Sequence, residues 1–417
     1  MPADERGDGR VGSASYSAAD RAARTAYGRL LAWLSCRTGD MAGAEDALAD
    51  AFAAALTSWP ERGVPDAPDA WLLQVARRKL TDRARRAQTR RTHEPDLVRL
   101  FEDLAMTETP DAIGDQRLSL LFTCAHPAID PAVRTPLMLQ TVLGLDAAHI
   151  ARVFVVAPKT MAQRLVRAKR KIKAAGIPFD LPDRSDWPAR MDAVLSAIYA
   201  AYTAGWDGSG PVGDAGDRLV DEAEWLARLL SEWVSDHAEA HGLLALILYC
   251  ESRRPARTGT YTPLSEQDTS LWDHRMIDEA ETCLRTAAGL GAPGRFQFEA
   301  AIQSVHAERR HSGETNWQAL LRIYDALIAQ NPALGAWVAR AAVIMEADEP
   351  KAALDALDAL PQDRAVAYGP YWATRAHCLQ RAGRLEEAVA AYDRAIALTD
   401  DGSARSYLQS RRVRLVN

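Results

Sequence analysis

The stretch that decides the fold is LGLDAAHIARVFVVAPKTMAQRLVRAKRKIK, residues 143–173, which contains two helical patterns joined by a short connection. In the first pattern, Leu145, Ile150 and Val153 are expected to form the buried stripe. Pro158 suits the first turn of a second helix, because its ring fixes φ and the N–H that it lacks would be unpaired there. The stretch therefore predicts two helices with a turn at residues 155–157.

The second of these helices separates into an apolar face and a cationic face. Apolar residues recur at spacings of four, three and four, at Met161, Leu165, Ala168 and Ile172. These positions share one side of a helix. The side chains expected to face outward are Lys159, Thr160, Gln163, Arg164 and Arg167. Such a helix can enter the major groove of DNA, where Gln pairs with adenine and Arg with guanine. A basic amphipathic helix inside a bundle is the competing interpretation.

The two helices and their turn have the layout of a helix-turn-helix motif, but the turn differs from the usual sequence of that motif at two positions. Val155 stands where most such turns have Gly, and a β-branched residue is strained if the position requires a positive φ. Ala157 has no side-chain oxygen with which to cap the helix that follows.

Charge is distributed unevenly along the 417 residues, whose net charge is −6. Residues 1–180 hold 26 Lys and Arg against 22 Asp and Glu, or +4, and residues 181–417 hold 24 against 34, or −10. The positive charge gathers at residues 77–91 and 147–179. Two basic segments favour two contacts with a polyanion, because neutralised phosphates supply most non-specific affinity for nucleic acid. Two solvated helix faces would give the same charge pattern.

Length and composition predict several globular domains, with 48% hydrophobic and 25% charged residues. The five cysteines lie far apart without a CxxC pair, which disfavours disulfides and zinc knuckles and favours a reducing cytoplasm. We expect neither a secretion signal nor a membrane span, since no apolar run of 18 residues occurs.

Apolar residues recur at intervals of three and four almost everywhere, so the chain is predicted to be all-α. In the first part, helices are expected at residues 18–37, 43–58 and 70–86. In the last part, residues 372–398 place Ala376, Ala388 and Ala395, and the larger Trp372, Leu379 and Tyr392, as a tetratricopeptide repeat of 34 residues does. Residues 317–330 and 334–348 are interpreted as a degenerate copy. Any alanine-rich helical hairpin is the alternative.

Two motifs of the first part complete the pattern. AEDALADAF, residues 44–52, is an acidic amphipathic helix, and WLLQVARRKLTDRARR, residues 71–86, carries an arginine-rich face. With residues 143–173, and in this order, they resemble the extracytoplasmic-function group of bacterial RNA polymerase sigma factors. Segments such as LLFTCAHPAI (120–129) and LSEQDTSLWD (264–273) resemble the subgroup with a tetratricopeptide-like C-terminal extension.

The resemblance implies five segments: a disordered tail at 1–17, sigma region 2 at 18–91, a linker at 92–114, sigma region 4 at 115–176 and the helical extension at 177–417. It implies that core RNA polymerase binds Glu45, Asp46, Asp50 and Phe52. It also implies that Arg77, Arg78, Arg85 and Arg86 bind the minus-ten strand of promoter DNA, while the cationic face at 159–167 reads the minus-thirty-five element.

No catalytic site is predicted, because no nucleophile–base pattern, phosphate loop or paired-carboxylate setting stands out. No cofactor or metal is expected either: Cys124 and His126 are two residues apart without further ligands, and a buried cysteine is the preferred interpretation. The polar residues flanking Trp272 either line a groove or cap helices.

The implied function is therefore promoter-specific transcription initiation, with the acidic extension as a module for a regulatory protein or peptide. The alternative is a helix-turn-helix regulator or a repeat scaffold that acts without core polymerase.

Overall fold

The computed structural model describes residues 26–90, 115–206, 214–257 and 261–416. Every regular element in these residues is a helix, which confirms the all-α prediction. The described residues separate into two compact units: 26–201 with 214–222, and 202–206 with 223–416. The predicted tail at 1–17 and linker at 92–114 lie outside the described residues.

The first unit begins with three helices that share one core. They span residues 26–38, α2 (Met41–Arg62) and α3 (Pro68–Arg90). Asp40 starts α2 as its N-cap, because its carboxylate accepts a hydrogen bond from the Gly43 N–H at 3.1 Å. Buried side chains from all three helices pack together, among them Leu34, Leu48 and Leu72. This core supports the surfaces of α2 and α3 on which the acidic and arginine-rich motifs lie.

The remaining helices of the first unit vary in length, and two of them, α6 and α7, are started by aspartate caps. They are α5 (Arg117–Cys124), α6 (Pro131–Thr141), α7 (Ala147–Val153), α8 (Pro158–Ala174), η2 (Arg184–Asp186) and the larger part of α9 (Met191–Trp206), up to residue 201, with the start of α10 (Asp214–Trp233). Asp130 caps α6 and Asp146 caps α7 through side-chain acceptors. α8 packs on α6 and α7.

The turn between α7 and α8 has the backbone strain that its sequence suggests. Val155 has a φ of 51° and its side chain is 93% exposed. Ala157, the N-cap of α8, makes no side-chain cap hydrogen bond. The expectation that Val153 belongs to the buried stripe is wrong, because it is 41% exposed, whereas Leu145 and Ile150 are buried. Val153 is the last residue of α7, where helix packing covers a side chain less completely.

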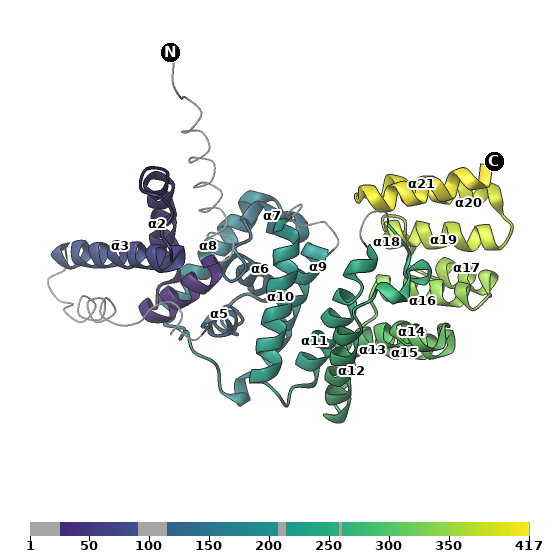
Figure 1. Cartoon of the computed structure of the whole chain (residues 1–417), viewed down its shortest axis with the longest axis horizontal. Coiled ribbons are helices and arrows are strands. Elements are labelled where there is room, and N and C mark those ends of the chain that lie inside the picture. The colour runs from purple at the N-terminus through teal and green to yellow at the C-terminus, as the bar shows by residue number, and fades with distance from the viewer. Residues whose placement is uncertain (1–25, 91–114, 207–213, 258–260, 417) are drawn as a thin grey trace, which may run out of the picture. The chain divides into compact units, whose positions relative to one another are not determined.

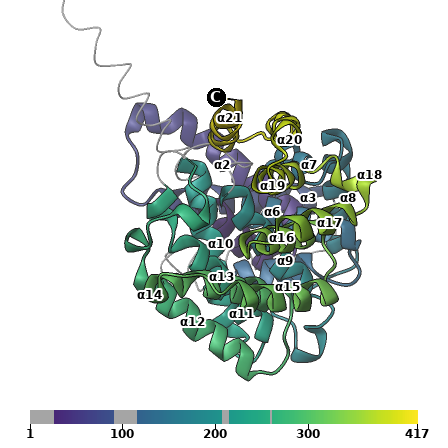
Figure 2. The ribbon, with the colours of Figure 1, turned by 90° about the vertical axis from the view of Figure 1, so that its right-hand side faces the viewer.

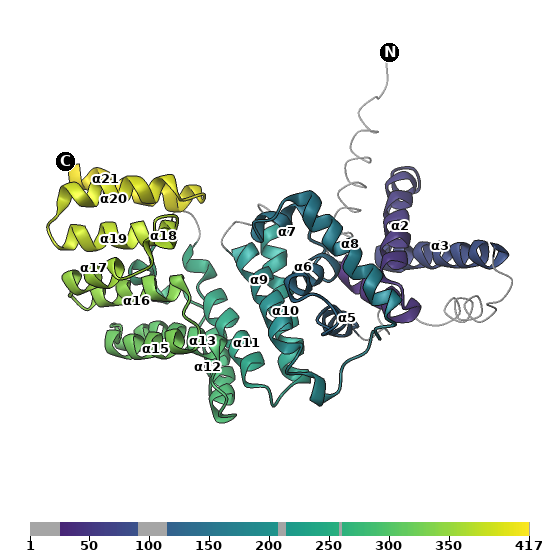
Figure 3. The same ribbon diagram turned by 180° about the vertical axis from the view of Figure 1, so that it is seen from behind.

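The second unit is a succession of packed helices, which Figures 1, 2 and 3 show from three sides. After α10 the longer ones are α11 (Ala238–Glu251), α12 (His274–Gly289), α13 (Arg295–Ala307), α15 (Trp317–Gln330), α16 (Leu334–Glu346), α17 (Pro350–Asp358), α19 (Gly369–Arg381), α20 (Leu385–Ala397) and α21 (Gly402–Val416). The short ones are η3 (Arg254–Arg257), η4 (Leu264–Glu266), η5 (Thr269–Leu271), α14 (Arg309–Ser312) and α18 (Gln362–Ala365).

A repeat of 35 residues organises the end of this unit. The starts of α16 and α17, Leu334 and Pro350, recur 35 positions later at the starts of α19 and α20, Gly369 and Leu385. The turns match as well, since Asp348 has a φ of 70° and its counterpart Gly383 a φ of 76°. The degenerate copy is therefore α16–α17, and the predicted pairing of 317–330 with 334–348 is out of register by one helix.

Small residues allow the two helices of the last hairpin to pack closely, as predicted. Ala376, Ala388 and Ala395 are fully buried, and Leu379 and Tyr392 fill the space between the helices. Among the described residues, no helix is both long and apolar enough to cross a bilayer.

Candidate nucleic-acid interface

The cationic face of α8 is open to solvent. Its five predicted residues, Lys159, Thr160, Gln163, Arg164 and Arg167, are all exposed. The opposite face is buried at all four predicted positions, Met161, Leu165, Ala168 and Ile172. The spacing argument therefore placed both faces correctly. The structure leaves the first turns of α8 free to meet a large partner.

The arginine-rich face of α3 is only partly open. Arg78 and Arg85 are exposed, and the side chain of Arg86 lies outside the described residues. Arg77 is half-buried, with its guanidinium carbon 4.2 Å from the centroid of the Trp33 ring. Arg37 lies over the same ring at 5.3 Å. Trp33 thus fixes Arg77 by a cation–π contact, which the sequence did not indicate because Trp33 belongs to a different helix.

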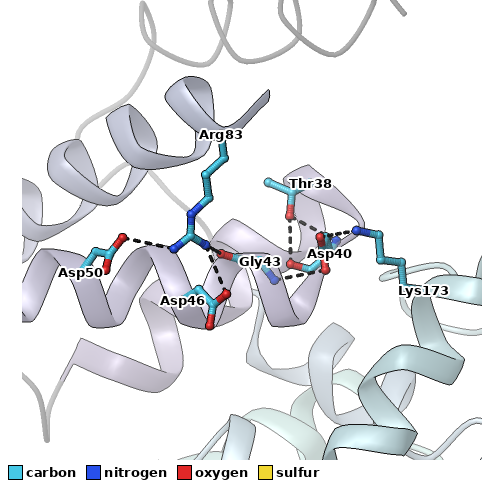
Figure 4. A network of polar contacts seen from close by, with 7 residues as sticks. All are labelled: Thr38, Asp40, Gly43, Asp46, Asp50, Arg83 and Lys173. Carbon is cyan, nitrogen blue, oxygen red and sulfur yellow. Dashed lines mark hydrogen bonds and ion pairs between the residues drawn. The ribbon is translucent and has the colours of Figure 1, made fainter. Parts of the chain in front are cut away.

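Arg83 of α3 holds the acidic face of α2, as Figure 4 shows. Its Nη1 lies 3.3 Å from Asp46 Oδ2, and its Nη2 lies 3.1 Å from Asp50 Oδ2. Nη1 also donates to the Gly43 carbonyl at 3.4 Å. These groups are substantially exposed, so the pairs position the side chains more than they stabilise the fold. Sequence reasoning missed this role of Arg83.

The other predicted residues of α2 also contact the chain itself. Phe52 is half-buried and packs against the core of the three N-terminal helices. Glu45 lies beside α8, where Lys169 Nζ donates to both of its carboxylate oxygens at 2.6 Å. Lys173 Nζ, one turn further along α8, lies 2.5 Å from Asp40 Oδ2. The acidic side of α2 therefore contacts the C-terminal end of α8, at Lys169 and Lys173. The exposed cationic face of α8 lies nearer its N-terminal end, at residues 159–167.

Burial governs the titratable groups between these helices. Tyr27 has a raised pKa, because it is buried and because the Glu45 carboxylate lies near it. Burial also raises the pKa of Cys124 to about 12. Its Sγ lies 3.6 Å from the Thr141 hydroxyl. Cys124 is thus a protonated thiol within the core, in keeping with the preferred interpretation of the sequence.

The polar residues around Trp272 cap helices. Asp268 accepts from the Ser270 N–H at 2.9 Å, and Asp273 accepts from the backbone N–H groups that start α12. Trp272 is buried. The sequence left open whether these residues line a groove or cap helices, and Asp268 and Asp273 both cap helices.

A buried network joins Tyr202 to the end of α11 within the second unit. The Tyr202 hydroxyl donates to Glu251 Oε1 at 3.0 Å, and Arg254 Nε donates to Glu251 Oε2 at 2.6 Å. Burial raises the pKa of Glu251, although Arg254 opposes the rise. The partners are satisfied within the network, which is consistent with a structural role.

Comparison with known proteins finds a family match for two segments of the chain. Residues 23–90, which contain α2 and α3, match sigma-70 region 2, and residues 190–288 match a family of unknown function, DUF6596. No solved structure matches the chain significantly.

The match to region 2 supports a sigma factor of the sigma-70 family, and region 2 implies binding to core RNA polymerase and promoter DNA. It is similar over most of its length to the uncharacterized protein R00370 of Rhizobium meliloti (strain 1021). The two are 37% identical over 377 residues, which is 88% of each chain. The chain belongs to the same family as that protein.

Proposed function

We propose that this protein is a sigma factor of the extracytoplasmic-function type that reads a promoter with two helices, α3 and α8. The observation that carries the proposal is the exposed cationic face of α8, at residues 159–167, in a chain that also contains region 2. Arg and Gln side chains on the first turns of a helix can form paired hydrogen bonds with base edges in the major groove. In this proposal α8 belongs to region 4 and reads the minus-thirty-five element.

The face of α3 supplies the second contact. Arg78 and Arg85 are exposed and reach phosphates of the unpaired minus-ten strand, while the buried Trp33 ring holds the half-buried Arg77 guanidinium in place beside them. Arg86 extends the same arginine-rich sequence. Stacking and phosphate contacts offset the few kcal/mol that unstacking a base costs.

Core polymerase binds the acidic side of α2 in this proposal, through Glu45, Asp46, Asp50 and Phe52. Arg83 orients two of these carboxylates and Phe52 adds apolar surface. The repeats of the second unit form a tetratricopeptide-like module for a regulatory protein or peptide. Stacked helical hairpins offer extended surfaces to such partners.

In-vitro transcription tests the function directly. Purified core polymerase and the full-length chain are combined on a genomic fragment library, and the start sites are mapped. Initiation that requires both components supports the proposal. DNA binding by the chain without any effect on core polymerase would favour an independent helix-turn-helix regulator instead.

The role of α8 is tested by Arg164→Ala. We expect the variant to relax recognition at one minus-thirty-five position, at a cost of about 1–3 kcal/mol. Equal losses on all promoter sequences would show that Arg164 contacts phosphate alone.

A further inference from the structure

We propose that the free protein is held in a closed state, in which α8 of the α5–α8 segment (residues 115–176) covers Glu45 on the polymerase-binding side of α2. This inference rests on the proposed function, because it assigns a regulatory contact to the same acidic side chains. Opening of the closed state then precedes binding to core polymerase.

The first element of the closed contact is a buried ion pair. Lys169 is only 8% exposed, although it belongs to a strongly basic helix. Its ammonium donates to both oxygens of Glu45 at 2.6 Å, across 124 residues of sequence. A buried ammonium without a counter-charge is costly, so Glu45 compensates the burial of Lys169. Core polymerase must displace Lys169 to reach this carboxylate.

A second ion pair lies at the edge of the contact. Lys173 is more exposed than Lys169, and its Nζ lies 2.5 Å from Asp40 Oδ2. Asp40 also caps α2 through Oδ1, so it is held in place independently of Lys173. Figure 4 shows the contacts of Asp40 with Lys173 and Gly43, beside those with Thr38, and, further along α2, the separate contacts of Arg83.

The third element does not involve charge. The helix at residues 26–38 approaches the end of α6 so closely that a Cβ added to Gly28 would lie 1.9 Å from the Val142 carbonyl oxygen. Gly144 follows in the same turn with a φ of 67°, and a Cβ there would meet the Tyr27 ring at 3.4 Å. The two surfaces therefore fit at the level of the backbone, and only glycine allows the approach at position 28.

The closed contact is too compact to span a promoter. Minus-ten and minus-thirty-five elements are about 25 base pairs apart, which is about 85 Å of duplex at about 3.4 Å per base pair. The path from the Arg164 Cα through the Lys169–Glu45 and Asp46–Arg83 contacts to the Arg78 Cα is at most about 50 Å, or about 65 Å with both arginine side chains extended, at a helical rise of about 1.5 Å per residue. Both elements are read only after α8 leaves α2.

Two variants test the contact without altering the proposed polymerase- or DNA-binding residues. Lys173→Glu replaces attraction to Asp40 by repulsion, and Gly28→Ala blocks the backbone approach to Val142. The matched control is Lys171→Glu, which makes the same charge change at an exposed position on the same helix. Apparent affinity for core polymerase is measured with full-length proteins and without DNA.

We expect both test variants to bind core about three- to tenfold more tightly than the wild type. When most molecules are closed, the apparent affinity for core polymerase is the affinity of the open state multiplied by the fraction of molecules that are open. Variants that raise this fraction therefore bind more tightly. The control should match the wild type. Test variants that bind core with wild-type affinity would overturn the closed state, and so would a control that gains as much as Lys173→Glu.

A zero-length carbodiimide cross-link provides an independent readout, because it joins a carboxylate only to an amine in direct contact. We expect mass spectrometry of the free wild-type chain to find Lys173 joined to Asp40, and to find less of this product after core is added. Absence of the product overturns the closed state. If neither the wild type nor any variant bound core polymerase, the proposed function would be overturned instead. The cross-link is measured in the free chain, so it tests the closed state even in that case.

Discussion

Replacing Val155 by Gly should stabilise the first unit, although the change removes a side chain from the turn before α8. Val155 adopts a φ of 51° and is 93% exposed, so its side chain contributes strain and almost no burial. A left-handed conformation costs a residue with a Cβ about 1–2 kcal/mol. Glycine avoids this cost but loses about 0.5–1 kcal/mol more conformational entropy on folding.

The net expectation is a gain of about 1 kcal/mol, since a β-branched residue lies at the upper end of the strain range. For a unit of this size, that raises the melting temperature by about 2–4 °C. Differential scanning calorimetry of the full-length chain measures the transition of the first unit. Val155→Ala keeps a Cβ without the branch and should fall between the wild type and Val155→Gly.

Val153→Gly is the matched control, because Val153 is also exposed but is the last residue of α7 and has no positive φ. We expect this control to lose up to about 1 kcal/mol, as glycine does in a helix. If Val155→Gly lost as much stability as Val153→Gly, the turn would not be strained and the reasoning would fail.

Three further predictions concern single side chains. Gly383→Ala should destabilise the second unit by about 1–2 kcal/mol in urea denaturation, because its φ is 76°; Gly289→Ala, at the end of α12 with nothing within 4 Å, should instead stabilise it slightly. Val166 is 46% exposed on the cationic side of α8, so Val166→Ala should lose about 1 kcal/mol of preference for one promoter thymine; replacing that thymine by uracil should cost the wild type but not the variant. Burial, together with nearby Arg253, lowers the pKa of His306 to about 4; the unfolded chain, with a pKa of about 6.5, then binds more protons, so stability is lost as pH falls from about 6.5 to about 4. His306→Gln should flatten this dependence in unfolding curves; an unchanged slope would show that His306 is not its source.

Apolar spacing predicted much of the fold, because burial on one face of a helix imposes a period on the sequence. Met161, Leu165, Ala168 and Ile172 are buried for this reason, and the all-α class follows from the same pattern along the chain. The period is a weaker guide at the end of a helix. Val153 fits the spacing, yet it lies in the last turn of α7, beyond the surface that the neighbouring helix covers.

The sequence located the repeat near the C-terminus correctly, but it did not show which two upstream helices form the second copy. The hairpin at residues 372–398 is evident from its small and large residues, but in its upstream copy Asp348 replaces Gly383 and the glycine that marks the turn is lost. Aspartate tolerates a positive φ because its side chain is short and polar. The register of the copy becomes clear only from the backbone of the two turns.

The amino-acid sequence by itself determined the all-α class, most of the buried helix faces and the two cationic segments, since each depends on neighbours within a few turns of the same helix. Only the tertiary structure decided how the charges are used. Arg164 and Lys169 are both basic residues of α8, yet Arg164 is exposed and Lys169 is buried against Glu45. Isolated helices give no sign of this difference, because it arises from a carboxylate that lies 124 residues away in the chain.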